Sequence, residues 1–218
     1  MPVATVPAAS YNRGMNKAIV LTGIKHCGKS ALGRLLAQEL NCPFYDTDAV
    51  IRELTGRSAR EIYTENGAEA FAFSETAACR FLAETLSAAQ YKYAETVSAV
   101  IATGGGICGN TGALDILHTF GIFVFLDIGE RLAADRIAAE IVFENGTMRN
   151  LPAYIACKNP ATEQDVRNCF SEFYKERTAL YGKIADLTWT PEAVSKDVNA
   201  KNLAAALRTA GAVSPPSA

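Results

Sequence analysis

The sequence has no long apolar segment and few side chains of the kinds that bind metals. Within its 218 residues, no apolar run approaches the roughly 20 residues that a membrane-spanning helix needs. It has only two histidines, and its six cysteines are scattered without a Cys-x-x-Cys pair. This pattern favours neither a metal cluster nor a disulfide framework. We therefore expect no membrane partner, and we expect reduced thiols in a cytoplasmic protein.

Excess charge of one sign is also lacking. The formal net charge is −2, so the sequence indicates no surface for binding nucleic acids. Residues 1–16 have no basic region followed by an apolar core, and we expect no signal peptide there. We expect residues 1–16 and 211–218 to be disordered extensions, with Met15 a candidate for the true start. Residues 17–210 are then expected to form a single domain.

The clearest functional pattern lies in residues 18–30. Residues 18–21 are all apolar, which predicts a short buried strand, and leucines at helical spacing follow the pattern. Between them, Gly23, Gly28, Lys29 and Ser30 match G-x-x-x-x-G-K-[ST], the phosphate-binding loop or P-loop. The motif therefore stands between a strand and the N-terminus of a helix, where its chemistry requires it.

Each part of this loop predicts a contact with a nucleotide. Backbone N–H groups of such a loop point inward toward phosphate oxygens, and the helix dipole adds partial positive charge. Lys29 is expected to reach the β- and γ-phosphates, and the Ser30 hydroxyl to bind Mg²⁺. Gly23, Gly28 and Ala31, the last in the first helical turn, complete the predicted ATP site. The sequence thus predicts ATP and Mg²⁺ as cofactors.

The rest of the chain alternates between strand and helix patterns. A continuous apolar run at 122–126 and short, largely β-favouring segments at 44–45, 98–102 and 186–189 predict four more strands. We expect an α/β fold with three layers, in which helices cover both faces of a central, mainly parallel five-stranded sheet. Capping residues predict that helices begin after Ser58 and Thr162. Residues 140–160 contain glycine and prolines, and we expect an irregular segment that acts as a lid.

Two polar motifs follow strands that are expected to end beside the P-loop. Asp46 and Asp48 follow the second strand, and Gly104, Gly105 and Gly106 follow the third. Ligands of open parallel sheets bind at the carboxyl ends of the strands. Three consecutive glycines are unfavourable unless the backbone must pass close to another group.

Together these motifs resemble the shikimate kinase family. The resemblance covers about residues 17–207, in matching order, and includes Arg177 with Tyr181 near the end of a long helix. It implies a P-loop kinase of the nucleoside-monophosphate-kinase type, which transfers a phosphoryl group from ATP to a ring hydroxyl of shikimate. We expect a monomer whose partner is a small-molecule alcohol.

The resemblance also implies a role for individual residues. Asp46 is expected to hold Mg²⁺, and Asp48 to bind the substrate hydroxyls and to orient or deprotonate the attacking one. Gly104, Gly105 and Gly106 are expected to present backbone N–H groups to the substrate. Arg177 is similar to the arginine near the substrate carboxylate, Arg136 to the arginine against adenine, and Arg149 to a cation of the lid.

The sequence departs from the family where the carboxylate is held. The family motif Phe-Arg-x-x-Glu is replaced by Phe71-Ala72-Phe73-Ser74-Glu75, so its arginine is absent, and the lid motif Arg-Pro-Leu-Leu is absent too. Three hypotheses therefore stay open. The first is a shikimate kinase whose carboxylate site is rebuilt from Arg177 with Arg149 or Arg80. The second is a kinase of another hydroxy acid or polyol, such as a gluconate-like acid. The third is a nucleotide-binding homologue without transfer activity.

Overall fold

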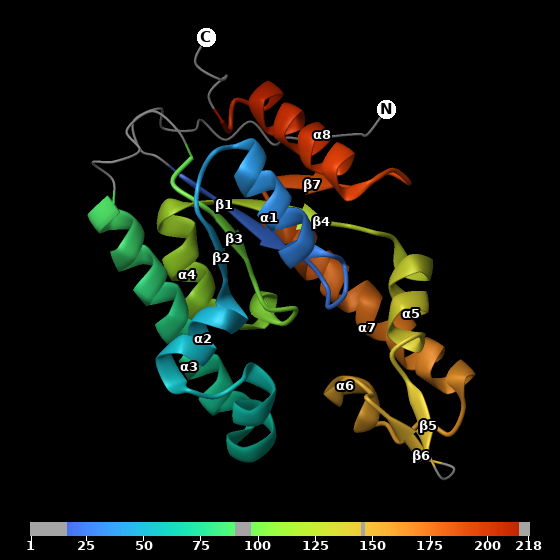
Figure 1. Cartoon of the computed structure of the whole chain (residues 1–218). Coiled ribbons are helices and arrows are strands. Elements are labelled where there is room, and N and C mark those ends of the chain that lie inside the picture. Colours follow the sequence, from blue (N-terminus) through green and yellow to red (C-terminus); the bar gives the residue numbers. More distant parts are fainter. Residues whose placement is uncertain (1–16, 90–96, 145–146, 214–218) are drawn as a thin grey trace.

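A five-stranded sheet runs through the centre of the computed structural model, which describes residues 17–89, 97–144 and 147–213 (Figure 1). The strand order is β2-β3-β1-β4-β7, and each neighbouring pair is parallel, as predicted. The five strands are β1 (Ala18–Thr22), β2 (Phe44–Asp46), β3 (Val100–Ala102), β4 (Gly121–Leu126) and β7 (Leu187–Trp189). The disorder expected for residues 1–16, and for 214–218 of the expected tail 211–218, lies outside the described residues. For residues 211–213 the expectation of disorder is wrong, because Ala212 and Val213 pack against the core and the N–H of Ala212 donates to the carbonyl of Leu207 at 2.9 Å.

Helices cover both faces of this sheet. On one face lie α1 (Lys29–Glu39) and α8 (Lys196–Thr209), which pack against each other (Figure 1). Helices α4 (Thr111–Phe120) and α7 (Glu163–Ile184) lie against the other face. The remaining helices are α2 (Thr47–Thr55), α3 (Ala59–Ala89), α5 (Glu130–Ala138), α6 (Ala153–Ala156) and the 3₁₀ helix η1 (Ile107–Gly109). Among the described residues, no helix is long and apolar enough to cross a membrane.

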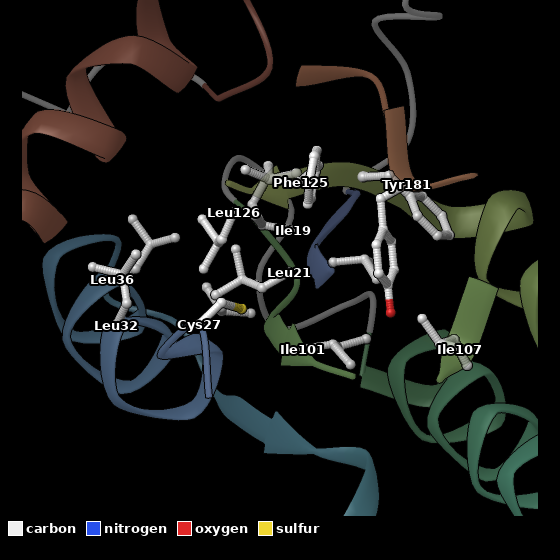
Figure 2. Close-up of a cluster of buried hydrophobic side chains, with 14 of the residues drawn as sticks. Ile19, Leu21, Cys27, Leu32, Leu36, Ile101, Ile107, Phe125, Leu126 and Tyr181 are labelled. Atoms are coloured by element: carbon white, nitrogen blue, oxygen red, sulfur yellow. The ribbon is translucent and has the colours of Figure 1, made fainter. Parts of the chain in front are cut away.

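The core lies on both sides of the sheet and fixes how the helices carry the site. Toward α1, the packing is so close that a Cβ on Gly33 would lie 3.1 Å from a methyl carbon of Leu21. On the opposite face, Tyr181 of α7 is fully buried and stacks on Phe125 of β4, with ring centroids 5.4 Å apart (Figure 2). Helices α1 and α7 are therefore fixed by packing, and the polar residues that they carry at the carboxyl edge of the sheet are positioned with them.

The prediction of one irregular segment over residues 140–160 is wrong. The strands β5 (Val142–Glu144) and β6 (Thr147–Arg149) pair antiparallel, with Val142 opposite Arg149, and α6 follows them. Strands of three residues are too short to produce a recognisable alternation of apolar and polar residues. In Figure 1 this hairpin extends away from the central sheet, beyond the end of α5.

The helix starts follow the capping residues. Ser58 and Glu61 exchange hydrogen bonds in a capping box, and Thr162 does the same with Asp165. Both predicted starts are confirmed, because capping is a local interaction that the sequence contains in full. The last helix begins at Lys196, where the hydroxyl of Ser195 caps it by accepting from Val198 N.

Candidate active site

The P-loop joins β1 to α1 in a tight turn that only glycine allows at two points. Gly23 has φ 141°, and a Cβ there would lie 2.9 Å from both Cys27 Sγ and the carbonyl oxygen of Leu126. Gly28, with φ 98°, forms the N-cap of α1. Side chains are strained at such φ values, so both glycines are required by the backbone itself. The loop predicted from the sequence is therefore present between a buried strand and a helix N-terminus.

Lys29 is held inside this loop. Its side chain is buried, and Nζ donates to the carbonyl oxygens of Gly23 (2.8 Å) and Ile24 (2.9 Å). The ammonium group thus lies within the curve of the loop that the motif assigns to phosphates. Ala31 is half-buried in the first turn of α1, directly after Ser30. In this arrangement the ammonium group, the backbone of the loop and the helix N-terminus together favour the binding of an anion.

Ser30 and Asp46, the two residues expected to bind Mg²⁺, lie next to each other. Ser30 Oγ donates to Asp46 Oδ2 at 2.5 Å, and Asp46 Oδ1 accepts from the backbone N–H of Asp48, which caps α2. Among the described residues there is no cluster of three or more His, Cys, Asp or Glu side chains that could hold a metal alone. Mg²⁺ is usually held by one or two protein oxygens together with substrate phosphates and water. One hydroxyl and one carboxylate beside a phosphate loop fit that ion.

Two carboxyl groups flank Gly104 at the end of β3. A Cβ on Gly104 would lie 3.0 Å from Glu75 Oε1 and 3.3 Å from Asp48 Oδ1. Although Asp48 as a residue is exposed, its carboxyl is crowded by protein, and this desolvation, with the charge of Asp46, raises its pKa. Burial raises the pKa of Glu75 to about 7, helped by the charge of Asp48, while a hydrogen bond from Asn110 opposes the rise. Gly104 therefore makes room for two acids that share a site.

The glycine triplet abuts the P-loop. A Cβ on Gly105 would lie 2.8 Å from the backbone nitrogen of Lys25, so the two loops are in direct backbone contact. The N–H of Gly104, which was expected to face the substrate, donates to Thr47 Oγ1 at 3.0 Å. Gly105 also accepts a hydrogen bond from Tyr181 Oη through its carbonyl (2.9 Å), and Gly106 is exposed. The missing side chain of Gly104 leaves the room that Glu75 and Asp48 occupy beside it.

Arg177 lies next to the turn that follows the glycine triplet. Its Nη1 is 3.1 Å from Cys108 Sγ and 3.4 Å from the position of a Cβ on Gly109. Its guanidinium carbon lies 5.2 Å from the ring centroid of Phe173, one helical turn earlier on α7. Phe173 also stacks on Tyr154 of α6, with ring centroids 3.6 Å apart. Arg177 is thus half-buried in an aromatic setting, as suits a cation that binds a ligand rather than solvent.

The other two expected cations lie on different elements. Arg136, on α5, donates from Nη1 to the carbonyl oxygen of His26 (2.7 Å), which brings it onto the outside of the P-loop. His26 Nδ1 lies 3.1 Å from a carboxylate oxygen of Glu140, so α5 and the residues after it are tied to the loop. Arg149 is exposed on β6, in the hairpin. The structure therefore brings Arg136 to the P-loop, and it leaves Arg149 on the segment expected to act as a lid. Arg80 is exposed on α3.

Three residues near the acceptor side were not assigned a role from the sequence. Thr47 holds Gly104, Glu75 flanks it, and Tyr154 packs beside Arg177 through Phe173. Glu75 could have been found, because it is the last residue of the motif in which Ala72 stands. No local pattern marks Tyr154, since its position depends on how the lid segment folds back onto α7.

Comparison with known proteins assigns the family. The family model "Shikimate kinase" matches residues 25–208. A shikimate kinase of Rippkaea orientalis is 32% identical over 192 residues, which cover 85% of this chain and 87% of the relative. A shikimate kinase of Synechococcus sp. (strain CC9902) is 31% identical over 193 residues, which cover 88% and 87%.

Solved structures agree with this result. A shikimate kinase from Acinetobacter baumannii in complex with shikimate aligns with a TM-score of 0.64 at 26% identity, and the match covers 91% of this chain and 95% of that one. A shikimate kinase from Aquifex aeolicus aligns with a TM-score of 0.60 at 27% identity, over 88% of this chain and 98% of that one. The motifs, the fold and these matches lead to one conclusion: this chain belongs to the shikimate kinase family.

Proposed function

We propose that this protein is an ATP-dependent kinase that phosphorylates a ring hydroxyl of shikimate to give shikimate 3-phosphate and ADP. The observation that carries the proposal is the backbone contact between Gly105 and Lys25. It joins the P-loop to the loop that carries the acceptor residues, so a terminal phosphate and an acceptor hydroxyl are brought side by side. Positioning of this kind supplies most of the catalysis of phosphoryl transfer.

On the nucleotide side, the P-loop and the first turn of α1 hold the phosphates. The backbone N–H groups from Gly23 to Ala31 bind phosphate oxygens, and Lys29 exchanges its loop carbonyls for the β- and γ-phosphates. Ser30 and Asp46 hold Mg²⁺, which neutralises charge on the phosphates when bound. Arg136, fixed to the outer side of the loop, lies along the nucleotide base, and Arg149 approaches the phosphates when the hairpin closes.

On the acceptor side, Asp48 orients the attacking hydroxyl and accepts its proton. The hydroxyl oxygen forms a bond to the γ-phosphorus, the bond from that phosphorus to the β–γ bridging oxygen breaks, and ADP leaves. A raised pKa makes the Asp48 carboxylate a better base than an ordinary aspartate, at the cost of a smaller ionised fraction. Gly105 and Gly106 border the acceptor, and Arg177 binds its carboxylate.

We further propose that the enzyme works as a cytoplasmic monomer on its small-molecule substrate, without a membrane or nucleic-acid partner. The balanced charge and the absence of cysteine pairs in the sequence support this.

One observation favours a second candidate. Ala72 stands where the family has a carboxylate-binding arginine, so another hydroxy acid, such as a gluconate-like acid, is the alternative acceptor. Loss of one partner of a buried charge pair commonly costs about 2–5 kcal/mol, which is roughly 30- to several-thousand-fold in affinity. A homologue that binds ATP without transferring phosphate is the third hypothesis, and the intact set Lys29, Ser30, Asp46 and Asp48 speaks against it.

The test is coupled ADP release with ATP and Mg²⁺, on shikimate and on gluconate. We expect turnover of shikimate by the wild type, near loss of it in Arg177→Ala, and a lower KM in Ala72→Arg, because a bidentate arginine supplies both charge and orientation. Rapid turnover of gluconate with none of shikimate would replace the first candidate by the second. Tight ATP binding without phosphorylation of either acid would support the third.

A further inference from the structure

Buried polar atoms without a protein partner gather at the acceptor end. Within residues 17–89, 97–144 and 147–213, three of the five such side-chain atoms are Glu75 Oε1, Tyr154 Oη and Arg177 Nε. The other two lie elsewhere, on Ser98 before β3 and on Arg208 in α8. A buried donor or acceptor that makes no hydrogen bond is unfavourable in a folded protein, and such groups are often completed by a ligand.

Tyr154 of α6 and Arg177 of α7 both pack against Phe173 of α7. The Tyr154 ring is nearly parallel to that of Phe173, at an interplanar angle of 11°, and the guanidinium of Arg177 lies over Phe173 as well. Burial raises the pKa of the Tyr154 hydroxyl, and the charge of Arg177 opposes this rise, so the two groups act on each other electrostatically. The phenol therefore stays protonated at neutral pH and remains a hydrogen-bond donor beside a cation.

Two buried donors, one of them cationic, call for an anionic acceptor. A carboxylate has two oxygens and several lone pairs, so it accepts from a guanidinium and a hydroxyl together. We propose that Tyr154 is a specificity-determining residue, whose hydroxyl donates to the acceptor's carboxylate beside Arg177. This hydrogen bond thereby replaces part of the carboxylate binding that is lost because Ala72 stands in place of the family arginine. This proposal rests on the proposed function, since it takes the acceptor to be a hydroxy acid.

The position of Tyr154 in the chain suggests how a carboxylate reaches the buried donors of Tyr154 and Arg177. Tyr154 lies on α6, a helix of only four residues that directly follows the hairpin of β5 and β6. We expect α6 to move with this hairpin, so that the ligand enters first and the phenol then closes on its carboxylate. A donor delivered in this way contributes to binding more than to the transfer step, so its loss raises KM rather than lowering kcat.

The experiment compares Tyr154→Phe with wild type. Phenylalanine keeps the ring that stacks on Phe173 and removes only the hydroxyl. We expect the Kd for shikimate, measured by calorimetry, and its KM to rise about 10- to 100-fold, the usual range for one hydrogen bond to a charged group. We expect kcat to change less than about threefold. Tyr174→Phe is the matched control, because Tyr174 lies on α7 and its hydroxyl already donates to Asp127 (2.6 Å). We expect the control to leave the Kd unchanged.

A second ligand separates a direct contact from a structural effect. Shikimate carboxamide lacks the negative charge, so we expect Tyr154→Phe to weaken its binding less than about threefold. The melting temperature of Tyr154→Phe should not fall, because the removed hydroxyl has no protein partner, whereas that of Tyr174→Phe should.

Equal affinities for shikimate in wild type and Tyr154→Phe would overturn the proposal while leaving the proposed function in place. Equal losses on shikimate and its carboxamide would overturn it too, in favour of a structural role. A wild type that neither binds nor phosphorylates shikimate would overturn both proposals.

Discussion

Glu75 is a buried acid in a site where the family provides an arginine, and its replacement should change how stability depends on pH. Only 1% of the residue is exposed, and its one hydrogen-bonding partner among the residues that the structure describes is Asn110, whose Nδ2 donates to Oε2 at 2.9 Å. The charge of Asp48 raises the pKa of Glu75, and the charge of Glu75 in turn raises the pKa of Cys79. The change we consider is Glu75→Gln, which keeps the shape and removes the titration.

The magnitude follows from the pKa of Glu75. Its value is about 7 in the folded protein and 4.5 in an exposed glutamate. The folded state therefore binds the proton more tightly than the unfolded state, so stability is highest at low pH and is lost as pH rises from about 4.5 through about 7. At about 1.4 kcal/mol for each pH unit, the loss in wild type approaches about 3 kcal/mol above pH 7. Glutamine does not titrate, so we expect Glu75→Gln to be more stable than wild type by about that amount at pH 8.

Urea unfolding at pH 5 and pH 8 measures the effect, because the difference between the two proteins cancels the titration of unrelated groups. For a chain of this size, about 3 kcal/mol corresponds to a melting temperature higher by roughly 6–12 °C at pH 8. Ala72→Arg is a second variant: a cation one helical turn before Glu75 should favour its ionised form and remove most of the pH dependence. If wild type and Glu75→Gln lose stability equally between pH 5 and pH 8, Glu75 is ionised at little cost and the reasoning fails.

Three further predictions concern the reaction. Lys29→Ala should abolish phosphoryl transfer with an unchanged circular dichroism spectrum. The control Lys183→Ala, on the exposed end of α7, should retain activity. Wild-type turnover in Lys29→Ala would contradict the assignment of the P-loop. Asp48→Asn should lower kcat by about 10²- to 10⁴-fold while calorimetry gives a nearly unchanged Kd for ATP; a comparable loss of ATP affinity would assign Asp48 to the metal instead. Amide exchange in 142–144 and 147–156 should slow when a non-hydrolysable ATP analogue and Mg²⁺ bind, with α4 as an internal reference; unchanged exchange would argue against a lid.

The parts of this structure that the sequence predicted are those determined over short distances along the chain. The P-loop, the five strands and the two capping boxes each depend on a few neighbouring residues. The parallel arrangement of the sheet and the clustering of Asp46, Asp48 and the glycine triplet also followed, because parallel strands deliver their carboxyl ends to one edge, whereas the order of the strands was not predicted.

The features that escaped prediction leave no recognisable pattern in the residues next to them in the chain. The N–H of Gly104 is used by Thr47, 57 positions away, and no local pattern marks that bond. The strands β5 and β6 have three residues each, so their pairing leaves no recognisable periodicity in the sequence. Tyr154 acquires its neighbours only when α6 folds against α7, so its chemistry cannot be derived from the residues beside it in the chain.

The distribution of donors and acceptors around the acceptor loop limits the molecules that fit it. Asp48 and Glu75 border Gly104, whereas Arg177 borders Cys108 and Gly109 and acts electrostatically on Tyr154. A ligand that satisfies both sides carries hydroxyl groups toward the acids and a carboxylate toward the cation. A ring holds these groups at one fixed separation, whereas an open-chain acid must lose rotational freedom to reach it, which weakens its binding. With the family's second cation absent, charge alone discriminates less between such acids, and we expect the rigid shape of the substrate to supply more of the selectivity.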